Sequence, residues 1–187
     1  MSLLRWLPTF LAFPVGGALA MQTIGSADEP VAAGLGGLLV GAVVGLAQWL
    51  ALRSHGTGPG WAVATPIGTA AGSAAAVAVT GGSTTIPALV TLGLVTGAFV
   101  GAAQGTQMGR GRLATALWAA VVSLSWGAGW LVTANVIVDA ERGFHMFGSS
   151  GALVATVATG LVLRVLLRGD TPTVGAPAAV ATVPSHS

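Results

Sequence analysis

Two glutamines stand in otherwise apolar sequence, where an amide could hydrogen-bond a polar solute or another side chain. Gln48 and Gln104 lie five and six residues before Arg53 and Arg110. At about 1.5 Å of rise per helical residue, each amide would lie somewhat less than ~10 Å inside the boundary that the arginine marks. A buried amide needs partners. The pair therefore predicts either a mutual or backbone hydrogen bond that fixes helix packing, or a polar constriction in a solute pathway.

A second group of polar side chains could hold a proton or a metal ion. Asn135, Asp139, Glu141 and His145 gather in one short segment. A helical turn would bring Glu141 and His145 together, but two ligands do not close a metal site. We expect a solvated turn and no metal.

Other reactive types are scarce. Trp126 and Trp130 are four residues apart; a pigment or quinone could stack on them, although packing against neighbouring helices or lipid is the preferred interpretation. Ser123 and Ser125 have no nearby His or acid to activate them. The absence of Cys excludes thiolate chemistry. We expect no catalytic residue, no cofactor and no enzyme activity.

The composition places these side chains in lipid. Only 6% of the 187 residues are charged, with a mean hydropathy of +0.84, whereas soluble domains carry about 25% charged residues. The pI of 11.2 reflects seven basic against five acidic residues, without a basic cluster or stacking surface. Nucleic-acid binding is therefore excluded, and the expected surroundings are a bilayer.

The elements that must position these residues are membrane helices. About 20 apolar helical residues cross a bilayer core, and six stretches qualify, separated by short breaks rich in Gly, Pro, Ser and charge. They cover approximately residues 6–24, 31–52, 61–79, 86–105, 113–138 and 147–167. The predicted fold class is an all-α integral membrane protein with six transmembrane helices.

Charged residues divide unequally between the two ends of these spans. The end that holds both termini carries Arg5, Arg53, Arg110, Arg112, Arg164 and Arg168 with a single acid, Asp170. The other end carries Asp28, Glu29, Asp139 and Glu141 with one base, Arg142. Because short Arg-rich loops stay in the cytoplasm, we expect both termini to be cytoplasmic.

One segment returns twice along the chain. GLLVGAVVGLAQ begins at Gly37, GLVTGAFVGAAQ at Gly93 and the weaker GALVATVATGLV at Gly151, at intervals of 56 and 58 residues. A tryptophan opens each preceding span. The pattern predicts three tandem two-helix repeats, about residues 6–54, 61–110 and 113–168, related as a pseudo-threefold parallel repeat about the membrane normal.

The two ends of the chain need separate interpretation. Arg5, an apolar run and residues 18–20 (Ala-Leu-Ala) also fit a cleavable secretory signal, which would leave five spans. Since the first span has a counterpart in both later repeats, we favour a structural helix. The six-span bundle would then cover residues 1–168, and residues 169–187, broken by three prolines, should form a flexible cytoplasmic tail.

Small residues recur at every fourth position in three spans. They are Gly37, Gly41 and Gly45, then Gly93, Gly97, Gly101 and Gly105, then Gly151, Ala155 and Thr159. Each set lines one helix face, and small residues let helices approach closely in lipid. We expect these ladders to join helices within the bundle. A homodimer contact or a docking groove for a partner helix is the alternative.

The tryptophans that open spans predict a different role. Trp6, Trp61 and Trp118 start at the expected cytoplasmic boundary, where an indole can keep its ring in the apolar zone and its N–H in water. We predict that they are interface anchors.

The run GAVVGLAQWLALR at residues 41–53, followed by Trp61, resembles uncharacterised bacterial multipass proteins that reiterate a Gly-Leu-x-Gln-Trp-Leu-x-Leu-Arg motif. The resemblance covers the second span and the loop after it. The second copy departs from the motif, with Gly105 in place of the tryptophan, and the third lacks the glutamine. The resemblance implies the fold and no known activity.

These features predict a non-enzymatic scaffold or accessory subunit that relies on small-residue helix packing. Its expected partners are the bilayer and other membrane proteins or a second copy. The alternative is a channel or transporter for a small neutral solute, suggested by the repeats and the paired glutamines. Ion coupling is disfavoured, because no Asp, Glu, Lys or His is central in any span.

Overall fold

The computed structural model describes residues 2–136 and 148–167, and within these ranges it contains six helical segments long and apolar enough to cross a membrane. The segments are α1 (Leu3–Trp6) with η1 (Leu7–Leu11) and α2 (Ala12–Thr23), α3 (Pro30–Leu52) with η2 (Arg53–His55), α4 (Gly60–Thr80), α5 (Ile86–Gln107), α6 (Gly111–Val136) and α7 (Ser149–Leu166). The predicted helical multipass fold is thus confirmed.

Prolines and glycines set several helix boundaries. Pro30 and Pro87 stand in the first turns of α3 and α5, where the missing N–H costs no helical hydrogen bond. α4 ends where Gly81 takes a φ of +62° and its N–H bonds the carbonyl of Val77 at 2.8 Å, a left-handed cap that favours glycine. Short connections follow these caps, so consecutive helices run in opposite directions.

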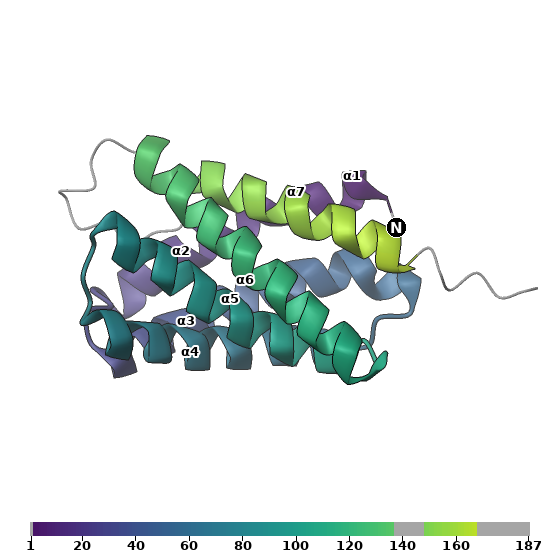
Figure 1. The fold of residues 1–187 in the computed structure, drawn as a ribbon, viewed down its shortest axis with the longest axis horizontal. Helices are drawn as coiled ribbons and strands as arrows, with labels where there is room; N and C mark the ends of the chain where they lie inside the picture. The colour runs from purple at the N-terminus through teal and green to yellow at the C-terminus, as the bar shows by residue number, and fades with distance from the viewer. Residues whose placement is uncertain (1, 137–147, 168–187) are drawn as a thin grey trace, which may run out of the picture.

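The helices form a closed ring around one core. Consecutive helices from α2 to α7 pack side by side, and η1 of the first segment returns to contact α7 (Figure 1). The first segment supplies Trp6 and Phe13 to the central cluster of buried side chains. This burial makes the first segment a structural part of the described bundle.

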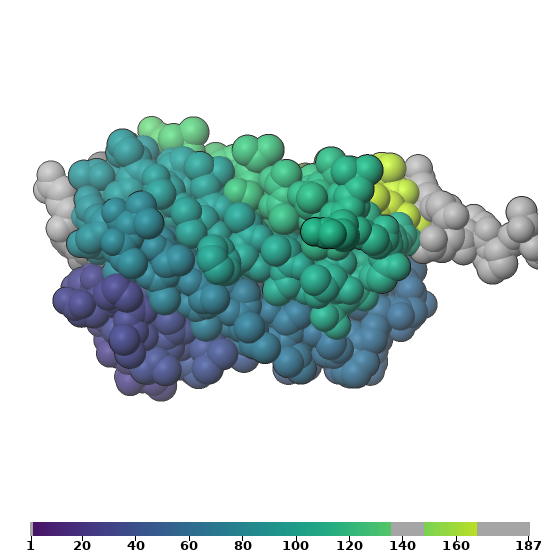
Figure 2. All heavy atoms as spheres, turned by 60° about the horizontal axis from the view of Figure 1, so that its bottom comes forward, coloured from purple at the N-terminus to yellow at the C-terminus, as the bar shows by residue number. Residues whose placement is uncertain are grey.

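The two ends of the ring differ in charge. The N-terminus, the 53–59 and 108–110 connections and the end of α7 lie together (Figure 1), and Figure 2 shows the end of α7 at the same end of the molecule as the start of α6. We call this the basic end, because it carries Arg5, Arg53, Arg110, Arg112 and Arg164. Asp28 and Glu29 lie at the opposite end. A guanidinium N–H of Arg110 donates to the carbonyl oxygen of Leu166. This bond joins the 108–110 connection to the end of α7 and satisfies a free carbonyl of that helix.

Several predictions concern residues outside the described ranges. They include the turn with Asp139, Glu141 and His145, the charges Arg142, Arg168 and Asp170, and the tail at residues 169–187. Asn135, which the sequence placed with that turn, lies near the end of α6 and donates its amide to the carbonyl of Leu131 at 2.7 Å.

Glycines bring α3 against α4 and α5 against α6. A Cβ built on Gly41 would lie 2.5 Å from the Cα of Pro66, and one built on Gly101 would lie 2.6 Å from the Cα of Ala119. A Cβ would also overlap a neighbouring helix at Gly37, Gly45, Gly93, Gly97, Gly105 and Gly151. These faces are therefore covered within the chain, and a partner helix cannot use the same contacts.

Bulky apolar side chains point away from the ring. Those exposed include Leu11, Leu19, Leu35, Leu46, Ile67, Phe99, Leu117, Leu124 and Leu161, which together represent all the spanning segments. So broad an apolar surface is unfavourable in water and suits contact with acyl chains, where the helical backbone satisfies its own hydrogen bonds.

Candidate functional site

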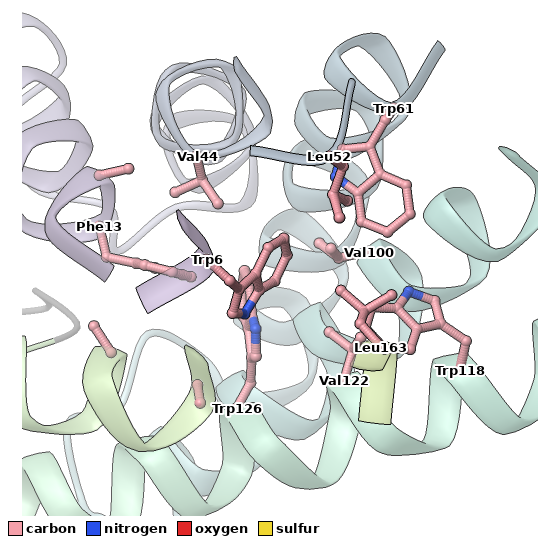
Figure 3. Packing of buried hydrophobic residues seen from close by; sticks show 13 residues of the cluster. Trp6, Phe13, Val44, Leu52, Trp61, Val100, Trp118, Val122, Trp126 and Leu163 are labelled. Atoms are coloured by element: carbon pink, nitrogen blue, oxygen red, sulfur yellow. The ribbon is translucent and has the colours of Figure 1, made fainter. Parts of the chain in front are cut away.

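Five side chains form a hydrogen-bonded group between four helices, which we call the Trp–Gln cluster. Gln48 comes from α3, Trp61 and Thr65 from α4, Gln104 from α5 and Trp118 from α6. Both glutamines lie in the last turns of their helices, beside the first turns of the next helix. Figure 3 shows Trp61 and Trp118 pointing between the helices. Their ring centroids are 6.1 Å apart.

The two glutamines bind each other and one indole each. Trp118 Nε1 donates to Gln104 Oε1 at 3.1 Å, and Trp61 Nε1 donates to Gln48 Oε1 at 3.2 Å. Gln104 Nε2 donates to Gln48 Oε1 at 2.9 Å and to Thr65 Oγ1 at 3.0 Å. Because an indole can only donate, Trp118 requires the oxygen of the Gln104 amide to face it. The NH2 group of Gln104 is then left for Gln48 and Thr65.

The hydroxyl of Thr65 completes the arrangement. It donates to the backbone carbonyl of Trp61 at 2.8 Å, so its oxygen remains free to accept from Gln104. This hydroxyl bonds its own helix and receives a bond from α5, and it thereby links α4 to α5. Sequence reasoning missed Thr65, because its partner Gln104 lies 39 residues away.

The cluster is buried and neutral. Gln104 is 2% exposed, Gln48 7% and both indoles 1%. Amide, indole and hydroxyl groups form hydrogen bonds but do not ionise near neutral pH. Interhelical hydrogen bonds in membranes contribute about 0.6 kcal/mol on average and up to about 2 kcal/mol. The arrangement therefore joins α3, α4, α5 and α6, as the packing interpretation of the glutamines requires.

The structure corrects the prediction that Trp6, Trp61 and Trp118 are interface anchors. All three indoles are 1% exposed, and none places its N–H in water. Trp6 lies against Gly160 and donates Nε1 to the carbonyl of Thr156 at 2.8 Å. The rings turn inward because glycine leaves room beside α7 and the glutamine oxygens supply acceptors inside the ring. A satisfied buried N–H removes the reason for an indole to reach the water boundary.

The pairing of tryptophans with glutamines had a signal in the sequence. Trp61 follows Gln48 by 13 residues and Trp118 follows Gln104 by 14. A short turn between two antiparallel helices folds the start of the second helix back beside the end of the first. The recurring Gln-to-Trp interval therefore indicates a contact between the two residue types.

Free space beside the cluster is uneven, and a pocket of about 150 Å³ at the basic end touches Trp61. A void of about 10 Å³ touches Gln48, Gln104 and Trp6, and a single water needs a cavity of about 10–15 Å³ or more. The space next to the glutamines is therefore no larger than about one water molecule.

The opposite half of the ring also contains a pocket of about 150 Å³. Phe13, Trp126 and Trp130 are among the residues that line it. Phe13 and Trp126 meet edge to face, with centroids 5.4 Å apart and an interplanar angle of 73°. Trp126 is 8% and Trp130 5% exposed, so both tryptophans face the interior of the bundle. Packing within the chain, one of the two alternatives to a bound pigment, is observed for Trp126.

Across residues 2–136 and 148–167, no group of three potential metal-ligating side chains comes together. Comparison of the chain with family models, curated proteins and solved structures finds no match.

Proposed function

We propose that this chain is a non-enzymatic multipass membrane protein that acts as a scaffold or accessory subunit. The observation that supports this best is the Trp–Gln cluster, where neutral groups from four helices satisfy one another near the basic end. Such an interior favours a rigid body over a conduit. The small-residue contacts add to this rigidity, because glycine faces bring whole helices into backbone contact.

A partner would have to bind away from the glycine ladders. Their faces are covered by α4 and α6, whereas the aliphatic side chains of the outer surface remain exposed. We propose that partner subunits or a second copy contact this outer surface or the polar ends of the bundle.

The proposal is tested on full-length protein extracted in mild detergent and reconstituted into liposomes. We expect co-elution with a partner at constant stoichiometry, and no flux of glycerol or urea above that of empty liposomes. Recovery as a lone monomer would contradict the scaffold. Flux would contradict it independently.

A channel or transporter for a small neutral solute is the second candidate. It is favoured by the pocket in the opposite half, which shares Phe13 and Trp126 as walls with the small void beside Gln48 and Gln104. Opening of the Trp–Gln cluster would then join the pocket to the void. In this case the double variant Gln48→Leu, Gln104→Leu should alter the flux of the solute into liposomes. An unchanged flux would show that the glutamines do not form the constriction.

We further propose three tandem two-helix repeats with pseudo-threefold symmetry. Two equivalent contacts support them, since Trp61 bonds Gln48 and Trp118 bonds Gln104. The third copy carries Val162 where the others carry glutamine, and Trp6 bonds a backbone carbonyl instead. The third copy thus lacks an amide that could accept from a tryptophan. A main-chain carbonyl, that of Thr156, accepts from Trp6 in its place.

The proposed location is the bacterial inner membrane with both termini cytoplasmic, as the arginines of the basic end favour. The chain has no Cys, so a single introduced thiol can be labelled uniquely. In intact cells, a membrane-impermeant maleimide should label Ser83→Cys at once and Ser54→Cys only after permeabilisation. Both positions are exposed, at opposite ends of the bundle. The reverse pattern would invert the proposed orientation.

A further inference from the structure

The pocket in the half of the ring opposite the Trp–Gln cluster has the properties of a ligand site. Its volume is about 150 Å³, and a cavity of about this size in a protein core admits benzene. Small residues of α2 and α3 line it, including Gly36, and the aromatic rings of Trp126 and Trp130 line it from α6. In the order of the ring, α3 and α6 face each other across the axis. The space therefore lies between a small-residue wall and an aromatic wall.

One hydroxyl in the wall of this pocket has no partner. Thr96 of α5 lines the pocket and is 4% exposed, and its Oγ1 makes no hydrogen bond. Threonines in helices usually bond the carbonyl four residues earlier, as Thr65 and Thr69 do here at 2.8 and 2.7 Å. A buried polar group without a partner costs free energy. Thr96 thus brings an unused donor and acceptor to the wall of the pocket.

The lining also limits the charge of an occupant. No ionisable side chain is among the described residues that line the pocket, so a charged molecule would lose its hydration without compensation. A planar ring, by contrast, can pack against Trp126, Trp130 and Phe13. A flexible acyl chain would leave the hydroxyl of Thr96 unsatisfied.

We infer that the pocket binds a neutral single-ring aromatic molecule with one hydrogen-bonding substituent, of the phenol class. The ring lies between the glycine-lined wall of α3 and the tryptophans of α6, and the substituent bonds Thr96 Oγ1. This site is independent of the scaffold function and of the glutamines.

The test uses the full-length protein in phosphatidylcholine nanodiscs and ¹⁹F NMR of 4-fluorophenol, with 4-fluorotoluene as the probe that lacks the polar group. We expect a bound signal that saturates at one equivalent per protein and is absent from empty nanodiscs. Absence of a saturable signal would mean that lipid chains or nothing fill the pocket, and would overturn the proposal.

Gly36→Leu tests the shape of the pocket, and Thr96→Val tests its hydrogen bond. Gly36→Leu should abolish binding of both probes, because a Cβ at Gly36 meets only Ala20 at 3.8 Å and a larger side chain can grow into the pocket. Gly34→Leu is the matched control on the same helix, with similarly ordinary Cβ contacts of 3.5 and 3.6 Å outside the lining. Binding that survives Gly36→Leu would overturn the site.

Thr96→Val tests the hydroxyl without a change of shape, and it remains informative if Gly36→Leu fails to fold. It should weaken 4-fluorophenol about fivefold, the usual effect of one hydrogen bond, and leave 4-fluorotoluene within about twofold. Equal effects on both probes would overturn the proposed bond to Thr96.

Discussion

Gly101→Ala should lower the free energy of unfolding by about 1–3 kcal/mol, and Gly41→Ala by a similar amount. The added methyl groups would lie 2.6 Å from the Cα of Ala119 and 2.5 Å from the Cα of Pro66. Backbone atoms cannot rotate out of the way as a side-chain end can, so the helices must separate. Unfolding of the purified protein by SDS in mixed micelles would measure the loss.

Gly36→Ala is the control for these substitutions. Its Cβ would meet Ala20 at 3.8 Å, an ordinary contact, and alanine favours a helix over glycine by about 1 kcal/mol. We expect unchanged or higher stability. If Gly101→Ala behaved like Gly36→Ala, the close approach of α5 to α6 would be wrong.

Gln104→Leu should lower the free energy of unfolding by about 2 kcal/mol. The substitution removes the acceptor of Trp118 and the donor to Gln48 and Thr65, and it leaves the Trp118 N–H buried without that acceptor. Gln107→Leu, on the exposed end of the same helix, should change the free energy by less than about 0.5 kcal/mol. Denaturation of both variants under one condition gives the comparison.

A double-mutant cycle isolates the bond between Trp118 and Gln104. Trp118→Phe removes the indole N–H, so in the Gln104→Leu background no donor is left without its acceptor. The two substitutions together should cost less than the sum of the single ones, with a coupling of about 0.5–1.5 kcal/mol. Strict additivity would show that the two side chains do not interact, which would contradict the geometry of the cluster.

Most of the fold could be predicted from local sequence. Whether a helix enters lipid depends on the sum of its residues' transfer free energies, which needs no knowledge of neighbours. The helix boundaries could be predicted for a similar reason, since Pro30 and Gly81 start and end a helix through the conformation of their own backbone. Such contributions add along the chain, and the predicted spans consequently agree with the observed helices to within a few residues.

The candidate site could be predicted only in part. Amides are rare in apolar spans, so Gln48 and Gln104 could be identified as candidates from the sequence, and they do bind each other. Thr65 could not be found in this way, because a threonine in a helix usually bonds its own backbone. The predicted direction of the tryptophan rings was also wrong. A tryptophan can place its N–H either at the water boundary or against a buried acceptor, and the residue type alone does not distinguish the two.

The sequence by itself determined that the chain is helical, where its spans lie and which faces carry small residues, because these properties depend on each residue and its near neighbours. Only the tertiary structure decided where Trp6 and Trp118 point, that Thr65 receives the amide of Gln104, and that Thr96 faces a pocket beside Trp126. These facts arise where separate helices meet. Which atoms then lie within bonding distance depends on the packing of the whole ring, and no local segment encodes it.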